Sequence, residues 1–104
     1  LLAIYLSVKK ESNMNSFMVV ATFKDGVTQD QIRALIPAEQ AQAKILEEKG
    51  LLGTIKVAMP RRTVFLEAFS ETEESVLEMI KTLPLAELWN LEVFMTTPPA
   101  GASL

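Results

Sequence analysis

Glu39 is the side chain whose position most suggests chemistry. It falls near the middle of an apolar arc at about 100° per residue, a pattern typical of a helix. The arc consists of Ile32, Leu35, Ile36, Ala43 and Leu46. A carboxyl there is held in a cleft or tied to a partner, because burying it alone is costly, and burial raises its pKa toward the range useful for a general base. If Pro37 instead shifts the helical phase, Glu39 reaches solvent.

Two other side chains are candidates for binding a substrate beside a catalytic Glu39. Lys56 follows the helix on a predicted strand, where it either pairs with Glu39, holds an anionic group, or is an ordinary exposed lysine. Trp89 begins the last predicted strand and either stacks on a flat substrate or packs at an interface. Arg61 and Arg62 form either an anion site or the solvated tip of a hairpin.

The composition narrows the chemistry that these residues can perform. The chain has 104 residues, enough for one domain, and contains neither histidine nor cysteine. The commonest metal ligand, the usual haem ligand and thiol chemistry are therefore missing, and we expect no metal and no cofactor. A net charge of −3 without a basic stripe disfavours a nucleic-acid partner.

The ends of the chain differ from the middle. Residues 1–6 are apolar, but they are far fewer than the ~20 needed to span a bilayer. The charged pair Lys9 and Lys10 follows this run, which is the wrong order for a signal peptide. We therefore expect a cytoplasmic protein without a membrane partner. The predicted organisation is an extension over 1–13 that packs on the domain or a neighbouring chain, a domain over 14–97 and a tail over 98–104.

The elements that must position Glu39 begin with a strand over 16–23, apolar on both faces and therefore central. Thr28 to Gln31 reads as a capping box, and the helix after it should be kinked or restarted by Pro37 and end at Gly50. Strands over 51–58 and 63–69 flank a four-residue hairpin loop. Ser70 to Glu73 reads as a second capping box, and the apolar stripe after it predicts a second helix that ends at Pro84. The last strand is predicted over 89–97.

The predicted order β-α-β-β-α-β is that of a ferredoxin-like α+β fold, an antiparallel sheet with both helices on one face. The other face then carries apolar side chains that include Phe65 and Phe94. Because a soluble monomer rarely exposes such a patch, we expect a second copy to cover it, giving a homodimer or a higher homo-oligomer.

Three stretches of this chain resemble the muconolactone isomerase family of dimeric α+β barrels. Residues 17–24 resemble the first strand of the family, and residues 38–50 its first helix with the glycine that follows. Residues 83–93, with Leu83-Pro84-Leu85 and the later Leu-Glu-Val, resemble its most specific turn and strand. The resemblance implies a dimeric α+β barrel, assembled further into decamers, that isomerises an unsaturated five-membered lactone by moving a proton without metal or cofactor.

Glu39 matches the acid of the family's first helix, while other family positions differ. The family lysine beside that acid corresponds to Gln40, and polar histidine and lysine positions of its first strand correspond to Met18 and Val20. A family histidine after the helix falls near Gly53 or Thr54. Two hypotheses follow: a cofactor-independent isomerase with Glu39 as the proton carrier, and a non-catalytic oligomeric domain of the same fold that binds a small molecule.

Overall fold

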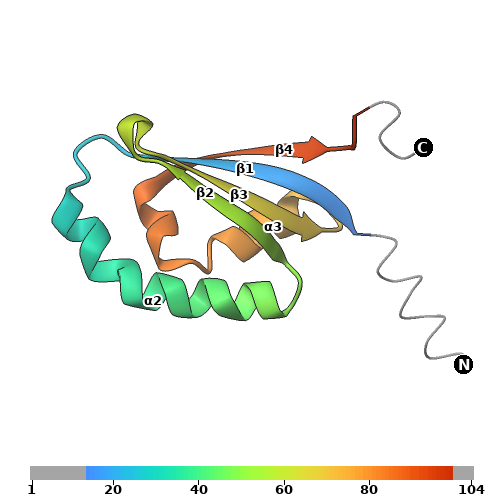
Figure 1. Ribbon diagram of the computed structural model, residues 1–104, viewed down its shortest axis with the longest axis horizontal. Coiled ribbons are helices and arrows are strands. Elements are labelled where there is room, and N and C mark those ends of the chain that lie inside the picture. The colour runs from blue at the N-terminus through green and yellow to red at the C-terminus, as the bar shows by residue number, and fades with distance from the viewer. Residues whose placement is uncertain (1–13, 100–104) are drawn as a thin grey trace, which may run out of the picture.

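The computed structural model describes residues 14–99 and confirms a ferredoxin-like α+β fold (Figure 1). The predictions for residues 1–13 and for the end of the tail, 100–104, lie outside this range. The elements occur in the predicted order β-α-β-β-α-β, with a 3₁₀ turn before β3 and another before β4. They are β1 (Asn15–Phe23), α2 (Gln29–Glu48), β2 (Leu52–Ala58), η1 (Met59–Arg61), β3 (Thr63–Ser70), α3 (Glu73–Ile80), η2 (Pro84–Leu88) and β4 (Trp89–Thr96).

The four strands form one antiparallel sheet in the order β2-β3-β1-β4. β1 therefore lies inside the sheet, as its two apolar faces predict, and β2 and β4 form the edges. Both helices lie on the same side of the sheet (Figure 1). The opposite side has no helix among the described residues, so this fold has one covered face and one open face.

The core lies between the covered face and the helices, and strand alternation decides which side chains enter it. Phe17, Val19, Ala21 and Phe23 of β1 are all buried, and β3 presents every second residue beside them. The next residues along β1 point to the open face. There Val20 lies opposite Phe65 on β3, and Met18, Val20's neighbour on that face, lies opposite Phe94 on β4. Phe65 is 37% exposed and Phe94 50% exposed, so the open face carries the predicted apolar patch.

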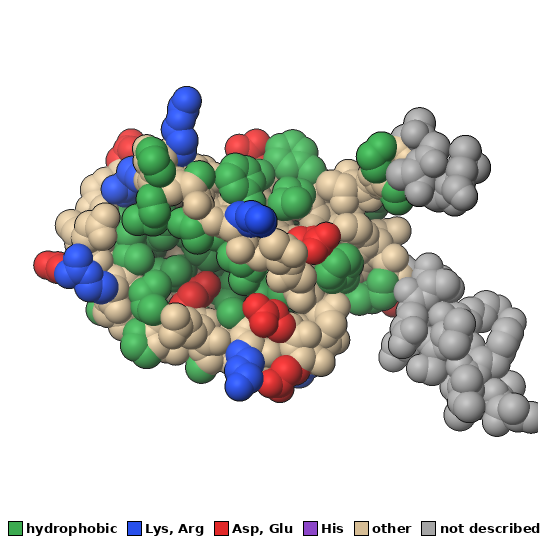
Figure 2. Space-filling view, viewed as in Figure 1, with side chains coloured by type: hydrophobic (Ala, Val, Ile, Leu, Met, Phe, Trp, Pro, Cys, Tyr) green, Lys and Arg blue, Asp and Glu red, His purple; other side chains and the backbone are tan. Residues whose placement is uncertain are grey.

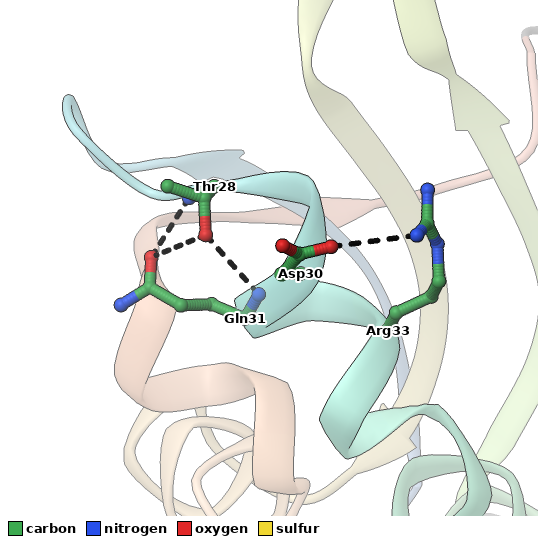
Figure 3. A network of polar contacts seen from close by, with 4 residues as sticks. All are labelled: Thr28, Asp30, Gln31 and Arg33. Atoms are coloured by element: carbon green, nitrogen blue, oxygen red, sulfur yellow. Dashed lines mark hydrogen bonds and ion pairs between the residues drawn. The ribbon is translucent and has the colours of Figure 1, made fainter.

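Helix α2 begins with the predicted capping box (Figure 3). The Thr28 hydroxyl accepts a hydrogen bond from the Gln31 backbone N–H at 3.2 Å, and the Gln31 side chain accepts one from the Thr28 backbone at 2.7 Å. Asp30 and Arg33 lie 3.4 Å apart in the same turn, but both are exposed, so this ion pair adds little stability. The reciprocal bonds fix where the helix starts and therefore the phase at which Glu39 meets the sheet.

Of the two outcomes predicted for Pro37, a kink or a restart of the helix, the restart does not occur, because α2 is one continuous helix from Gln29 to Glu48. The helix is bent, with its first turns at an angle to the rest (Figure 1). Proline removes one backbone donor, yet apolar side chains before and after it, including Ile36 and Ala43, pack against the same core. This shared packing holds both halves of α2 in one helical phase.

The second capping box was predicted two residues too early. Thr72 caps α3, with Ser75 as its reciprocal partner, instead of Ser70 with Glu73. Ser70 still belongs to β3, where it pairs with Asn15 of β1. The strand therefore extends to the point at which the sequence pattern placed the cap, and the helix starts later.

Candidate functional site

A cleft of about 560 Å³ opens between α2 and the covered face of the sheet near its β2 edge. Figure 2 shows apolar side chains gathered in this region, with an acidic side chain among them. Most of the wall is hydrophobic, and the polar side chains all come from α2. The lining residues are Ile36, Glu39, Gln40, Ala43, Lys44, Glu47, Ile55, Val57, Val64, Leu66, Leu85 and Trp89.

Glu39 lies in this cleft, half-buried, where the helical phase predicts it. Its Oε1 accepts a hydrogen bond from the backbone N–H of Leu85 at 2.8 Å. Leu85 is in the first turn of η2, where a backbone N–H has no partner within the helix, and no side chain of the preceding Leu83 caps it. Glu39 therefore caps η2 from another element. A second bond, from Gln42 to Thr82 at 2.9 Å, also ties α2 to this part of the chain.

Burial raises the pKa of Glu39 above its ordinary value of 4.5, since the apolar wall disfavours the charged form. The Leu85 N–H acts in the opposite direction, because it stabilises the carboxylate, but burial is the larger effect. The predicted cleft around Glu39, between the first helix and the sheet, is therefore found. Among the described residues, Lys44 is the one lysine or arginine that lines this cleft, and it is exposed.

Lys56 does not lie in the cleft and does not pair with Glu39; of the three alternatives for it, the exposed strand lysine is the one found. A register shift between Leu52 and Ile55 places Ile55 and Val57 on the covered face, where both line the cleft. Lys56, between them, pairs with Phe65 and shares the open face with it. In a regular strand Leu52 and Lys56 would have pointed to the same side, so the bulge decides this outcome.

Trp89 does lie in the cleft wall together with Glu39. It is only 4% exposed, and its ring tilts against that of Phe23 with 6.0 Å between centroids. Its indole nitrogen is buried and has no hydrogen-bond partner within residues 14–99. Trp89 therefore forms part of the closed wall of the cleft and is not an open stacking platform.

Arg62 has a structural role and does not form an anion site with Arg61. Its guanidinium donates hydrogen bonds to the backbone carbonyls of Lys24 at 3.2 Å and Val27 at 3.1 Å, which closes the loop between β1 and α2. Its backbone is left-handed, with φ 51°, as the hairpin turn requires. Arg61 is exposed at the same turn.

The sequence interpretation did not place three polar side chains in the cleft: Gln40, Lys44 and Glu47. All three follow Glu39 on α2 and flank the apolar arc, so their helical positions could have indicated it. It also missed the Leu85 N–H, for which Pro84 at the start of a helical turn was the only sequence signal.

Within residues 14–99, no cluster of three or more acidic side chains could hold a metal ion. In the same range, no helix has the length and apolar character needed to cross a membrane. No protein-family model matches this chain, and no curated protein matches it significantly. What the structure defines is a ferredoxin-like α+β domain with a carboxyl in an apolar cleft of small-molecule size.

Proposed function

We propose that the cleft binds a small, mainly apolar carbonyl compound and that Glu39 moves a proton within it, as in a cofactor-independent isomerase. One observation carries this proposal: a half-buried carboxyl of raised pKa is held by one oxygen inside an otherwise apolar cleft. A carboxyl of raised pKa is a better proton acceptor near neutral pH than an exposed one. The resemblance of Glu39 to the acid of the muconolactone isomerase family supports the same role.

The proton balance of the proposed reaction is simple. Glu39 as carboxylate takes a proton from the carbon next to the carbonyl, so that a C–H bond breaks and an O–H bond forms on Glu39. The electron pair moves into the conjugated system as an enolate. Glu39 then returns the proton to another carbon of that system, which shifts the double bond and regenerates the carboxylate. The Leu85 N–H fixes the carboxyl throughout, since it holds Oε1 at 2.8 Å.

The negative charge that develops on the substrate oxygen must be stabilised by a hydrogen-bond donor. The side-chain amide of Gln40 and the ammonium of Lys44 are the donors among the side chains that line the cleft with Glu39, apart from the enclosed Trp89 nitrogen. Each can donate a hydrogen bond to an enolate oxygen. We assign this stabilising role to them in place of Lys56, which lies on the open face.

Hydrogen exchange from carbon tests the proposal without knowledge of the product. The protein is incubated in D₂O with unsaturated five-membered lactones, and deuterium incorporation next to the carbonyl is followed by NMR. Wild type should accelerate incorporation into at least one lactone, and Glu39→Gln should abolish it, because the shape is kept and the base is lost. Glu47→Gln is the matched control, since Glu47 lines the same cleft but is exposed.

The same experiment separates the second candidate, a non-catalytic small-molecule-binding domain. One observation favours this candidate: of the polar side chains that line the cleft, only Glu39 is half-buried. Gln40, Lys44 and Glu47 are exposed, so no second shielded polar side chain assists Glu39 in catalysis. Chemical-shift changes at the cleft without deuterium incorporation would support binding alone. Incorporation that survives in Glu39→Gln would contradict the assignment of the base.

A further inference from the structure

The charges around the cleft indicate which kind of molecule it accepts. Its ionisable side chains are two acids, Glu39 and Glu47, and one base, Lys44. Lys44 and Glu47 lie one helical turn apart at the exposed rim, so their opposite charges largely offset each other for a ligand inside. The deeper charge is that of Glu39, and it is negative.

Two other cations near this end of the sheet, Lys56 and Arg62, do not line the cleft. Lys56 lies on the open face, because the bulge in β2 turns it away. The Arg62 guanidinium is hydrogen-bonded to the carbonyls of Lys24 and Val27. An anion placed beside Glu39 would therefore lose its hydration and meet a like charge without a buried cation to compensate.

Glu39 itself retains hydrogen-bonding capacity toward a ligand. Its Oε1 accepts the Leu85 N–H, and no other hydrogen bond to this carboxyl is formed within residues 14–99. An ionised carboxyl offers about four acceptor sites. The site can therefore accept a hydrogen bond from an acidic O–H or N–H group of a ligand, while the walls formed by Ile36, Val57, Leu66 and Trp89 contact its apolar part.

We infer that the cleft selects neutral, mainly apolar molecules that direct an acidic O–H or N–H group to Glu39, and that it discriminates against carboxylates. This inference rests on the proposed function, because it concerns the substrate class of the same site. An enol formed from a carbonyl compound is one such molecule: it is neutral and carries an acidic O–H.

Three compounds of similar shape test this selection on the full-length protein: naphthol, methoxynaphthalene and naphthoate. Naphthol is neutral with an acidic O–H, methoxynaphthalene lacks that donor, and naphthoate is an anion. Binding is measured near neutral pH by NMR titration, with the Leu85 amide and the methyl groups of Ile36 and Val57 as reporters. We expect naphthol to bind at least about tenfold more tightly than naphthoate and several-fold more tightly than methoxynaphthalene.

Two substitutions connect the selection to Glu39. Glu39→Gln removes the negative charge, so it should weaken naphthol binding several-fold and strengthen naphthoate binding. Glu48→Gln, on the same helix but outside the cleft lining, should change either affinity by less than about twofold, because an exposed charge is screened by solvent.

The outcomes separate this inference from the proposed function. If naphthoate binds as tightly as naphthol, or methoxynaphthalene binds as tightly as naphthol, the selection is wrong, while proton transfer to lactones can still be measured in D₂O. If none of the three compounds shifts the cleft signals at millimolar concentration, the selection is refuted as well, and deuterium incorporation into the lactones still tests the isomerase by itself. Loss of deuterium exchange alone would refute only the isomerase.

Discussion

Replacing Glu39 by alanine and by glutamine separates its hydrogen bond from its charge. In the wild-type chain, the Leu85 backbone N–H donates to Glu39 Oε1 at 2.8 Å. Glutamine keeps a side-chain oxygen that can accept this hydrogen bond, whereas alanine removes the acceptor. A buried donor left without a partner costs about 1–3 kcal/mol. Water can enter the open cleft, so we expect the lower part of this range, and the higher helix propensity of alanine offsets a few tenths of a kcal/mol.

The predicted difference is therefore about 1 kcal/mol, with Glu39→Ala less stable than Glu39→Gln. In a domain of this size, that corresponds to a difference in Tm of about 4–8 °C. Thermal and urea unfolding followed by circular dichroism measure it. The same pair of substitutions at Glu47, which is exposed, should differ by only a few tenths of a kcal/mol.

The charge of Glu39 determines whether Glu39→Gln is more or less stable than wild type at a given pH. The folded-state pKa lies above the ordinary value of 4.5, so the folded state binds the proton more tightly than the unfolded state does. Below the unfolded pKa the carboxyl is neutral in both states and carries no penalty. As pH rises through the unfolded and then the folded pKa, wild type loses stability relative to Glu39→Gln, and the difference is constant above that window.

At pH 7, Glu39→Gln should therefore be at least as stable as wild type. A loss above about 1 kcal/mol would mean that the carboxylate is stabilised by an ion pair in the folded state, and the assignment of Glu39 as a proton carrier would then fail. Equal stability of the alanine and glutamine variants would instead show that water fully replaces the carboxyl at Leu85.

Other contacts give independent predictions. Arg62→Ala should cost about 0.5–1 kcal/mol in urea unfolding, because two carbonyls lose a charged donor that water at this exposed turn partly replaces, and Arg61→Ala, without such bonds, should cost little. Leu66→Ala should cost about 2–5 kcal/mol, because its side chain is 1% exposed in the core, and a cost below about 1 kcal/mol would contradict the packing described. We expect light scattering to show a homodimer at micromolar concentration. Phe65→Lys with Phe94→Lys should convert it to a folded monomer, and a monomeric wild type would refute a sheet-to-sheet dimer.

Much of the fold follows from patterns that depend only on local sequence. The two apolar faces of β1 predict a central strand, and β1 does lie inside the sheet, with Phe17 and Val19 1% exposed or less. The helical phase predicts that Glu39 faces the sheet, and it does so because packing on both sides of Pro37 preserves that phase. These predictions succeed because periodic burial is stronger than the loss of one helix hydrogen bond.

The remainder of the site depends on features without a local signal. The register shift after Leu52 places Ile55 and Val57 at the cleft in place of Lys56. No residue type in β2 predicts a bulge by itself, although Gly53 is compatible with one. From sequence, Arg62 is typical of a solvated hairpin tip, because its hydrogen bonds to the loop between β1 and α2 join segments far apart in the chain. Both outcomes are set by contacts between segments far apart in the chain.

Trp89 gives this protein an intrinsic optical reporter at its cleft. It is the one tryptophan of the chain, it is 4% exposed, and it lines the same wall as Glu39. Its fluorescence therefore comes from a single environment, and emission at short wavelength is expected while the indole is shielded from water. Unfolding of the core and occupation of the cleft act on one fluorophore, so a ligand titration and a denaturation curve can be recorded on the unlabelled chain.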